Sequence, residues 1–536
     1  MEDFKNTRLQ QASEMPPSEE LQNTIPQELP ADISQEIKEK IEAELHPEST
    51  ADLAKDVREA EEEELAEAQA EGEAIPHDRL TRSKLLKLLM RKQYIALREE
   101  TEEEHPADLA ELLEDLDENN RLVIFRILKK EVATEAFTYM SDEARNDLVE
   151  AFSDAELVNT LEVMSLDDAA DMLEDMPASV VKRVLNKSDR KTREILNRLL
   201  NYPEYSAGSI MTPEYVRLHQ KMTVKEAFAA IRIQGENAET VYTCYVVERS
   251  KLVGVVSTRD LLLSEPACPI EELMDEKVRA VKVTDDQEYV AREMQHYDFA
   301  AMPVVDDEGM LVGIVTIDDA VDVLTEESTE DMQKMAAILP SDAAATYFET
   351  PVAEHMKQRI PWLMILMLSA TVTGMVTTHY ESAFEALPLL VSFMPMLMGT
   401  AGNCGNQINT LMVRGLALGD VEPRDFLRVL SKELRVSVLI GLALALVNGL
   451  RIYLMYGVFG SGTYTHVELY VLTVSLALFL SVILGKVVGG MLPLIAKKLG
   501  GDPAIMASPF ISTIIDACSL IIYFQIAMSV FAQIAL

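Results

Sequence analysis

The stretch DPAIMASPFISTIIDACSLIIYF, residues 502–524, is apolar and long enough to span a membrane, yet it carries a carboxylate well inside. Asp516 lies about 21 Å along a helix from Asp502, so it cannot readily reach the membrane surface. A charged group there costs about 2.5–3.5 kcal/mol on insertion scales, so it should face water or a cation. Ser512 shares its face, and Thr513 lies one turn before it. The stretch predicts a helix that lines an ion path; the alternative is a protonated Asp516 that only bonds a neighbouring helix.

Four further apolar stretches precede this one. Each is long enough, at about 1.5 Å rise per residue, to cross a hydrocarbon core of about 30 Å. Lys and Arg are concentrated in the loops after the second and fourth stretches. Because basic loops stay in the cytosol, we expect a multi-pass protein with its N-terminal half in the cytosol and its C-terminus outside. The predicted transmembrane domain, 358–536, is an all-α bundle of five helices: 359–379, 386–413, 435–459, 467–495 and 503–535.

The second stretch contains SFMPMLMGTAGNCGNQINTL, residues 392–411. Pro395 is expected to weaken the helix hydrogen bonds, and the glycines leave backbone uncovered beside amide side chains. Uncovered backbone at membrane depth is stable only against protein or a water-filled path. The stretch therefore predicts a second wall of the ion path, with a tight contact between small residues as the alternative. The glycines are Gly399, Gly402 and Gly405, and the amides are Asn403, Asn406 and Gln407.

Charge is segregated along the chain. The 536 residues have a net charge of -41, but from residue 356 onward there are 11 Lys and Arg against 9 Asp and Glu. The negative charge therefore lies in the first two-thirds, which should repel nucleic acid and attract cations. The four cysteines have no metal-ligand spacing and are expected to be reduced packing residues.

The acidic part divides into three regions. Residues 1–78 are rich in Glu, Gln and Pro, and we expect an acidic, disordered tail. Residues 79–203 show short amphipathic helices, and ADLAELLEDL at 107–116 returns as DDAADMLEDM at 167–176, which predicts an all-α superhelical repeat domain. From 204 to 328 the pattern is strand, helix, strand, and it occurs twice.

Both copies of this α/β unit end in G-h-h-[S/T]-x-x-D and resemble CBS domains, which pair around a cleft that often holds an adenine nucleotide. We place the tandem pair at about 204–268 and 269–328, followed by a connecting helix at 329–357. The resemblance implies ATP as a ligand, with hydroxyls on phosphate and carboxylates on ribose. The residues that it implies are Ser257, Asp260, Thr316 and Asp319.

The order of these parts resembles the MgtE family of Mg2+ channels and transporters. The motifs are G-T-A-G-N-C-G-N-Q at 399–407, D-P-A-x5-P-x3-T-x2-D at 502–516, the CBS pair and the acidic helical domain. The resemblance implies a homodimer in the cell membrane, with Asp516 of both subunits facing one Mg2+ path. Mg2+ keeps its waters, so few direct ligands are needed. The predicted pore residues are Asp516, Ser512, Thr513 and Asn403.

The resemblance also implies a cytosolic Mg2+ sensor that closes the pore when acidic surfaces share divalent ions. Without Mg2+ these surfaces would repel each other, and with it they would lock the connecting helix. For any one acid the alternative is a plain solvated side chain. The implied regulatory residues are Asp167, Asp171, Glu135, Glu288, Asp298, Asp319, Asp322, Glu327, Glu330 and Asp331.

The same residues leave one alternative to a channel open and argue against two other classes of protein. A proton-coupled secondary transporter of Mg2+, Mn2+ or Co2+ that uses Asp516 remains an alternative to a channel. A CBS-regulated anion channel would need basic or backbone N–H sites in the pore. We expect no enzyme, because no nucleophile, base and orienting group come together and no GxxxxGK[ST] loop is present.

Overall fold

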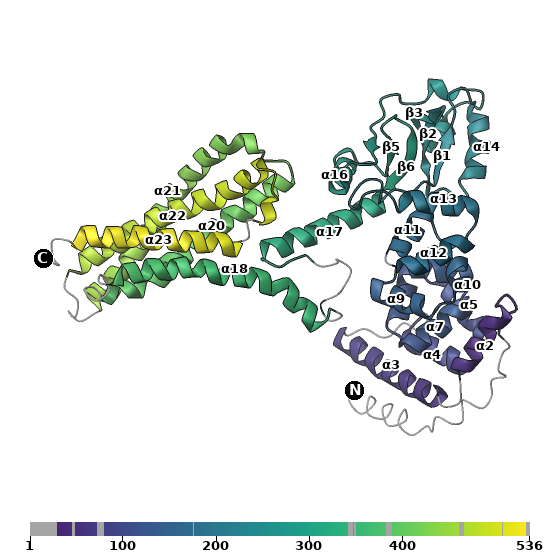
Figure 1. The fold of residues 1–536 in the computed structure, drawn as a ribbon, viewed down its shortest axis with the longest axis horizontal. Helices are drawn as coiled ribbons and strands as arrows, with labels where there is room; N and C mark the ends of the chain where they lie inside the picture. Colours follow the sequence, from purple (N-terminus) through teal and green to yellow (C-terminus); the bar gives the residue numbers. More distant parts are fainter. Residues whose placement is uncertain are drawn as a thin grey trace, which may run out of the picture. The chain divides into compact units, whose positions relative to one another are not determined.

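We describe the chain from a computed structural model, in which it forms two compact units, residues up to Leu324 and residues from Thr325 onward. Figure 1 follows the elements along the sequence. The residues that the structure describes are 29–45, 49–71, 80–174, 176–340, 347, 350–381, 388–459, 466–505 and 508–531.

The first unit begins with two helices in the region for which a disordered tail is predicted. α2 (Gln35–Glu44) packs against α7 (Glu118–Ile127), and α3 (Ser49–Glu71) packs against α4 (Arg82–Met90). Each helix has a short apolar stripe at helical spacing, which gives it one face to bury. The structure therefore corrects the prediction for residues 35–44 and 49–71, while 1–28, 46–48 and 72–79 lie outside the described residues. The buried side chains are Ile41, Leu53, Val57 and Ala60.

Ion pairs hold this N-terminal segment as well. The Arg126 guanidinium lies 2.7 Å from Glu44 and 2.8 Å from Glu156, and Arg98 lies 2.8 Å from Asp32. Composition had suggested too little apolar surface for folding. The paired charges reduce the amount of apolar burial that the segment needs, because they satisfy the buried guanidinium.

The described residues then hold ten short helices, where a helical domain is predicted over 79–203. Several of them start at a side chain that caps the helix. Asp117, for example, accepts from the backbone N–H of Asn120. The helices are α4 (Arg82–Met90), α5 (Tyr94–Glu103), α6 (Pro106–Glu114), α7 (Glu118–Ile127), α8 (Lys130–Thr138), α9 (Asp142–Ala151), α10 (Asp154–Leu161), α11 (Leu166–Glu174), α12 (Ala178–Lys187) and α13 (Arg190–Leu199).

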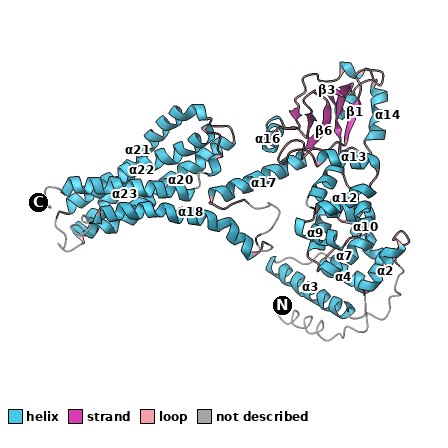
Figure 2. Cartoon of the chain, viewed as in Figure 1, coloured by secondary structure: helices cyan, strands magenta, loops and turns pink. Residues whose placement is uncertain are grey.

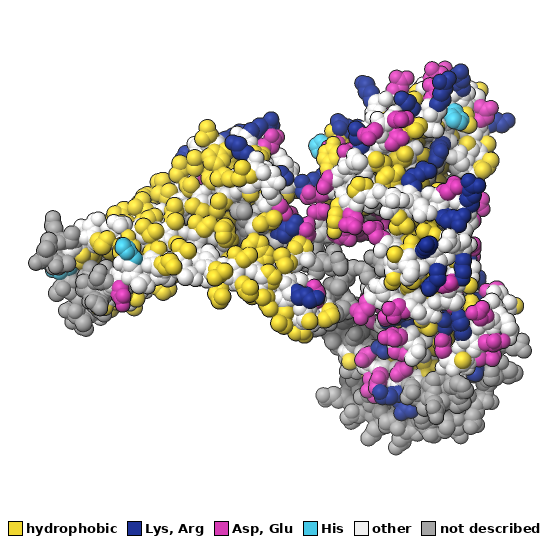
Figure 3. Space-filling model, in the orientation of Figure 1, with side chains coloured by type: hydrophobic (Ala, Val, Ile, Leu, Met, Phe, Trp, Pro, Cys, Tyr) yellow, Lys and Arg dark blue, Asp and Glu magenta, His cyan; other side chains and the backbone are white. Residues whose placement is uncertain are grey.

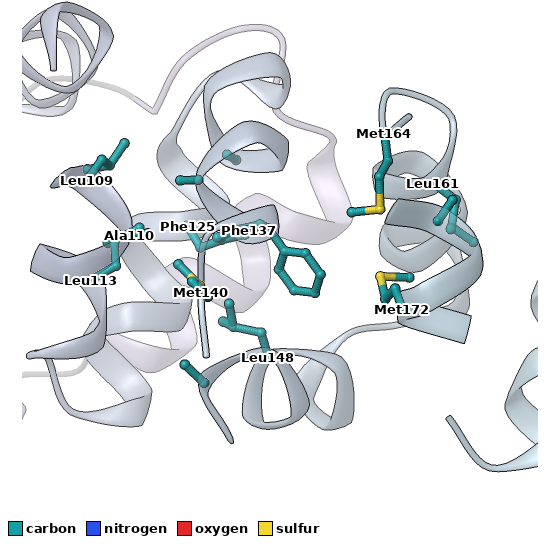
Figure 4. Close-up of a cluster of buried hydrophobic side chains, with 14 of the residues drawn as sticks. Leu109, Ala110, Leu113, Phe125, Phe137, Met140, Leu148, Leu161, Met164 and Met172 are labelled. Atoms are coloured by element: carbon teal, nitrogen blue, oxygen red, sulfur yellow. The ribbon is translucent and has the colours of Figure 1, made fainter. Parts of the chain in front are cut away.

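Their apolar faces meet in one core, shown in Figure 4. The rings of Phe125 and Phe137 lie 6.0 Å apart and nearly perpendicular within it. The two copies of the repeat, 107–116 and 167–176, correspond to α6 and α11. The all-α class predicted from the short amphipathic helices is confirmed.

Two three-stranded sheets follow, and Figure 2 shows that the strands gather in this region. In each sheet the first two strands are parallel and the last two antiparallel, as a duplicated unit requires. The strands are β1 (Tyr215–Leu218), β2 (Thr240–Glu248), β3 (Lys251–Ser257), β4 (Val281–Lys282), β5 (Ala301–Val305) and β6 (Leu311–Thr316). The helices are α14 (Val224–Gln234), α15 (Thr258–Leu263), η2 (Ile270–Glu272), α16 (Gln287–Tyr297) and α17 (Ile317–Met335).

The two copies exchange their first segments. Thr212, in the first copy, pairs with Ile314 on β6 through backbone hydrogen bonds of 2.8 and 2.9 Å. Asp275, in the second copy, pairs with Val255 on β3 through bonds of 3.1 and 2.8 Å. The repeated motif therefore builds one paired module rather than two separate sheets.

The repeated glycine of each ending is explained by this exchange. A Cβ on Gly254 would lie 2.8 Å from the sulfur of Met274, and one on Gly313 would lie 2.6 Å from the sulfur of Met211. Each methionine belongs to the segment supplied by the other copy. A larger residue at either position would push that segment away.

The connecting helix differs from its prediction at 329–357. α17 (Ile317–Met335) starts inside the second CBS copy and stops at residue 335. Ala337 then has a φ of 58°, a left-handed conformation that ends helices. Pro340 follows, and the next helix, α18 (Val352–His379), begins after Pro351. Part of the predicted stretch lies outside the described residues.

The second unit contains long apolar helices, and Figure 3 shows that hydrophobic side chains cover much of its surface in this view. By length and composition alone, four described segments could cross a membrane: Val352–His379, Pro423–Val458, Val467–Lys498 and Pro509–Phe531. The elements after α18 are η3 (Pro388–Phe393), α20 (Met394–Ala417), η4 (Pro423–Asp425), α21 (Phe426–Ile452), the π-helix η5 (Tyr453–Val458), α22 (Val467–Lys498), η6 (Pro503–Ile505) and α23 (Ser508–Phe531).

The predicted second span is the exception among the five. α20 has 24 residues, enough to cross, but its polar stretch at 399–407 lowers its hydropathy. Pro395 lies in the first turn of α20, so it starts the helix instead of weakening its hydrogen bonds, contrary to our expectation. Residues 382–387, where this span is predicted to begin, lie outside the described part of the chain.

α20 packs against α22 and α23 through small residues. A Cβ on Gly485 would lie 2.5 Å from the carbonyl oxygen of Ala401, and one on Gly489 would overlap the carbonyl of Gly405. Gly405 is thus a tight helix contact, as the alternative interpretation of its motif proposed. Gly402 faces α23 instead.

Candidate functional site

α20 and α23 bring together polar groups predicted to line the ion path. The Asn406 amide nitrogen donates to Ser512 Oγ at 3.1 Å, and the Ser512 hydroxyl lies 3.3 Å from Asn406 Oδ1. A Cβ on Gly402 would lie 3.6 Å from Ser512 Oγ and 3.9 Å from Asp516 Oδ1. The half-buried Asp516 carboxylate therefore stands beside bare backbone, a hydroxyl and an amide, which are groups that suit a hydrated cation.

Two predicted pore residues are not part of this contact. The Thr513 hydroxyl donates to the Pro509 carbonyl at 2.9 Å, and Asn403 is exposed on α20. Asn406 contacts Ser512 where Asn403 was expected to supply an oxygen. It lies four residues after Gly402 and so shares its face, a spacing that could have identified it from sequence.

Two charged side chains are buried in the bundle, and their burial was not predicted from the sequence. Glu433 on α21 is 7% exposed and Lys486 on α22 is 5% exposed. A Cβ on Gly490, one turn after Lys486, would lie 3.9 Å from Glu433 Cγ. The third span was predicted to begin at 435, which left Glu433 in a loop. The bundle therefore buries two charged side chains on the adjacent helices α21 and α22, and Glu433 Oε2 has no hydrogen-bond partner among the described residues.

A cluster of carboxylates forms on the first unit, where α11 and α17 begin. Asp167 and Asp168 lie in the first turn of α11, with Asp171 one turn on, and Asp318 and Asp319 lie in the first turn of α17. The electrostatic interactions between the two sets show that they face one another. The predicted Asp167, Asp171 and Asp319 are brought together, with two aspartates that the prediction left out.

Burial and the neighbouring acids raise the pKa values of these carboxyl groups. Burial, together with the charges of Asp167, Asp168 and Asp319, raises the pKa of Asp171 to about 7. Burial likewise raises the pKa of Asp319 to about 7, against the hydrogen bond from Thr316. Asp171 keeps contact with solvent at the edge of the cluster. These two carboxyl groups therefore keep their protons up to near neutral pH.

Two glutamates of the first CBS copy complete the cluster. Glu214 accepts from the backbone N–H of Leu166 at 3.0 Å, which fixes it at the start of α11, and burial raises its pKa. Burial, together with the charges of Asp167 and Asp318, raises the pKa of Glu239 to about 7. Neither was predicted, because they come close to α11 only through tertiary packing.

The remaining predicted regulatory acids are placed differently. Glu135 and Asp298 are exposed and are not among the main acidic neighbours of Asp171 and Asp319. Glu288 forms an ion pair with Arg292 on its own helix. Burial and Asp318 raise the pKa of the exposed Asp322. Three further residues lie on the part of α17 that belongs to the second unit: Glu327, Glu330 and Asp331.

Direct metal ligation is not preformed in the cluster. Across the described ranges, no three His, Cys, Asp or Glu side chains are close enough to hold a metal ion. The acids nevertheless fit Mg2+, which accepts carboxylates through its own waters. Binding through these waters requires nearby negative charge rather than a complete set of direct ligands.

The hydroxyls implied for nucleotide binding are engaged within their own motifs. Ser257 Oγ donates to Asp260 at 2.6 Å and accepts from its backbone N–H at 3.0 Å. Thr316 donates to Asp319 at 2.6 Å in the second copy. Asp319 also belongs to the acidic cluster, so its two predicted roles coincide at one carboxylate.

An apolar helical unit with an internal carboxylate, joined in one chain to a CBS pair and an acidic helical domain, defines a multi-pass ion transporter with cytosolic regulatory domains. Family models match in the same order: the MgtE intracellular N domain at 104–205, the CBS domain at 207–265 and 270–326, and MgtE, a divalent cation transporter, at 394–526. The chain belongs to the MgtE family.

Relatives support this assignment over most of the chain. The magnesium transporter MgtE of Thermus thermophilus is 39% identical over 437 residues, which cover 81% of this chain and 94% of that protein. The magnesium transporter MgtE of Bacillus subtilis is 33% identical, with 80% and 92% covered. The solved cytosolic domain of the Mg2+ channel MgtE in complex with ATP is 40% identical and covers 45% of this chain and 99% of that chain, with a TM-score of 0.43.

Proposed function

We propose that this protein carries Mg2+ across the cell membrane along a path beside Asp516. The observation that carries the proposal is the contact between α20 and α23, where Asp516, Ser512 and Asn406 share one face with the bare backbone of Gly402. A hydrated Mg2+ needs charge and acceptors for its waters rather than a dry cage. The magnesium transporters named above are similar over most of their length.

The path is completed, in this proposal, by a second copy of the chain. Asp516 is half-buried within one chain, so its open side is available to a symmetric partner. Two carboxylates on a two-fold axis would double the negative charge at the cation. The five-helix topology, with α20 as the second span and the C-terminus outside, belongs to the same proposal.

Regulation is proposed to reside in the acidic cluster. Asp171, Asp319 and Glu239 each have a pKa near 7, so their charges repel one another at cytosolic pH. Mg2+ bound through water would relieve that repulsion and hold α11, β2 and α17 together. Because α17 continues into the second unit, order in the cluster would be transmitted toward the membrane helices and close the path.

ATP at the CBS pair stays a prediction. Ser257 and Thr316 stand at the starts of two helices in equivalent positions of the two copies, as the motif requires. Their hydroxyls now bond Asp260 and Asp319, so a nucleotide would have to share or replace those bonds.

The decisive test is Mg2+ uptake by the purified protein in liposomes, with wild type compared with Asp516→Asn. Loss of one negative charge per chain from the path is expected to lower uptake by at least about tenfold, because a charge-assisted contact contributes roughly 1.5–3 kcal/mol. Imposing a pH gradient in the same liposomes separates a channel from a proton-coupled transporter.

The matched control is Glu468→Gln, an exposed acid at the start of α22 in the same unit. It should transport as wild type does. Equal uptake by Asp516→Asn and wild type would remove Asp516 from the path and contradict the proposal.

A further inference from the structure

Lys334, in the last turn of α17, stands between two carboxylates, one on its own helix and one 168 residues later in the sequence. Its Nζ lies 2.8 Å from Glu330 on the same helix and 2.8 Å from Asp502, in the connection between α22 and α23. The Lys334 side chain is 21% exposed and that of Asp502 is 32% exposed. An ion pair shielded to this degree is screened less by salt than one on an open surface.

Asp502 uses its other oxygen to hold the start of the pore helix. Oδ1 accepts from the backbone N–H of Ala504 at 2.8 Å, at the beginning of η6 (Pro503–Ile505). η6 is the element that precedes α23, the helix that carries Asp516, in the chain. One carboxylate therefore connects the last turn of α17 to the backbone of η6.

The segment after α17 is attached to the first membrane helix as well. The backbone N–H of Leu339 donates to the carbonyl of Gln358 on α18 at 3.0 Å, and Gln358 is buried. The last turn of α17 and the segment after it thus contact the connection between α22 and α23 and the helix α18.

Lys334 keeps its charge in this setting. Burial by itself would lower its pKa, but the hydrogen bonds to Asp502 and Glu330 hold that pKa above its ordinary value.

We infer that Lys334 and Asp502 are positioning residues that couple movement of the connecting helix to the pore helix, an inference that rests on the proposed function. When the cytosolic domains respond to Mg2+, the pair makes α23 follow α17. Without the pair, α17 can move while the ion path stays open. The pair therefore governs how strongly cytosolic-side Mg2+ reduces uptake.

The test compares Lys334→Gln and Asp502→Asn with wild type in liposomes, at low and high Mg2+ on the cytosolic face. The amide oxygen of Asn can still accept from Ala504, so Asp502→Asn removes the charge but keeps the cap. Each variant is expected to raise the Mg2+ concentration for half-inhibition by roughly 2- to 5-fold, the range of a partly exposed ion pair. Lys357→Gln, which breaks an ion pair of 2.6 Å with Glu354 on α18, is the matched control and should behave as wild type.

Charge reversal separates coupling from a general structural role. Lys334→Glu should uncouple more strongly than Lys334→Gln, and the double variant Lys334→Glu with Asp502→Lys should regain part of the inhibition. A double variant no better than Lys334→Glu alone would overturn the inference.

Thermal unfolding of the same proteins in detergent gives a readout independent of transport. In a cycle of Lys334→Gln, Asp502→Asn and the pair, the losses in Tm should be non-additive if the two side chains interact. If wild type transports no Mg2+ but the losses in Tm are non-additive, the proposed function is wrong and the Lys334–Asp502 contact is still supported. Additive losses with unchanged inhibition would overturn the contact itself.

Discussion

Asp516 and Asp171 are carboxylates in unfavourable surroundings, and different neighbours explain each. Asp516 stands beside Ser512 and bare backbone of α20, a polar strip within an apolar bundle. Asp171 stands among other acids, with its pKa raised to about 7 mainly by burial. In both cases the side chain is costly for the fold alone, which is typical of residues kept for binding.

The raised pKa values predict how stability depends on pH. Asp171, Asp319 and Glu239 keep protons in the folded state up to about pH 7, whereas the unfolded chain releases them near pH 4. The folded state therefore binds more protons between these values. The stability that these groups contribute to the folded state is fully present below about pH 4, and it is lost as the pH rises through about 7.

Mg2+ should reverse that loss. The rise in Tm on adding Mg2+ to the purified protein is expected to be larger at about pH 8 than at about pH 5.5, because protons occupy the same oxygens at low pH. Asp171→Asn should shrink the difference, while Asp108→Asn, an exposed acid on α6, should not. A Mg2+ effect that is independent of pH in wild type would argue against the cluster as the sensor.

At the scale of elements, α20 shows why composition alone does not define a membrane helix. Its polar stretch keeps it out of the set of apolar spans, yet it packs against both α22 and α23. Glycines on α20 and α22 let the two backbones approach closely, which buries the polar helix inside the unit.

This crossing leads to a prediction for Gly489→Ala. The new methyl group would overlap the carbonyl of Gly405, which is backbone and cannot move aside. We expect a loss of roughly 1–3 kcal/mol, seen as a lower Tm in detergent and less Mg2+ uptake. Gly374→Ala on α18 is the control, because a Cβ there meets no described atom within 4 Å. Equal Tm values for the two variants would contradict the close packing.

At the scale of the whole molecule, the N-terminal helices extend the acidic domain beyond the region that the family model matches, which starts at 104. α2 and α3 bury a few apolar side chains and place Asp32 and Glu44 on arginines of the domain. They act as an additional layer at one end of a stacked-helix domain, where exposed ends need covering.

A folded layer and a disordered tail respond differently to truncation of one side chain. Ile41→Ala removes a side chain with 0% exposure and should cost roughly 2–5 kcal/mol, whereas Leu65→Ala, 50% exposed on α3, should cost under about 0.5 kcal/mol. Both losses can be measured by unfolding the full chain in urea, with the protease sensitivity of the cytosolic part as the probe of unfolding. Equal losses of unfolding free energy in the two variants would mean that this segment is a disordered tail.

The sequence by itself determined the division into an acidic and an apolar part, the duplicated CBS unit and the position of Asp516. These features are written in composition, in short periods and in repeats, which are local properties of a chain. The resemblance to the MgtE family rested on the same local motifs, and the family is confirmed.

Only the tertiary structure decided which side chains meet. It paired Ser512 with Asn406, 106 residues earlier, brought Glu214 and Glu239 to α11, and joined Lys334 to Asp502. It also folded α2 and α3, whose buried apolar side chains and the ion pair of Glu44 have partners in other helices. Contacts between distant segments depend on how whole faces pack, and spacing along the chain carries no record of that.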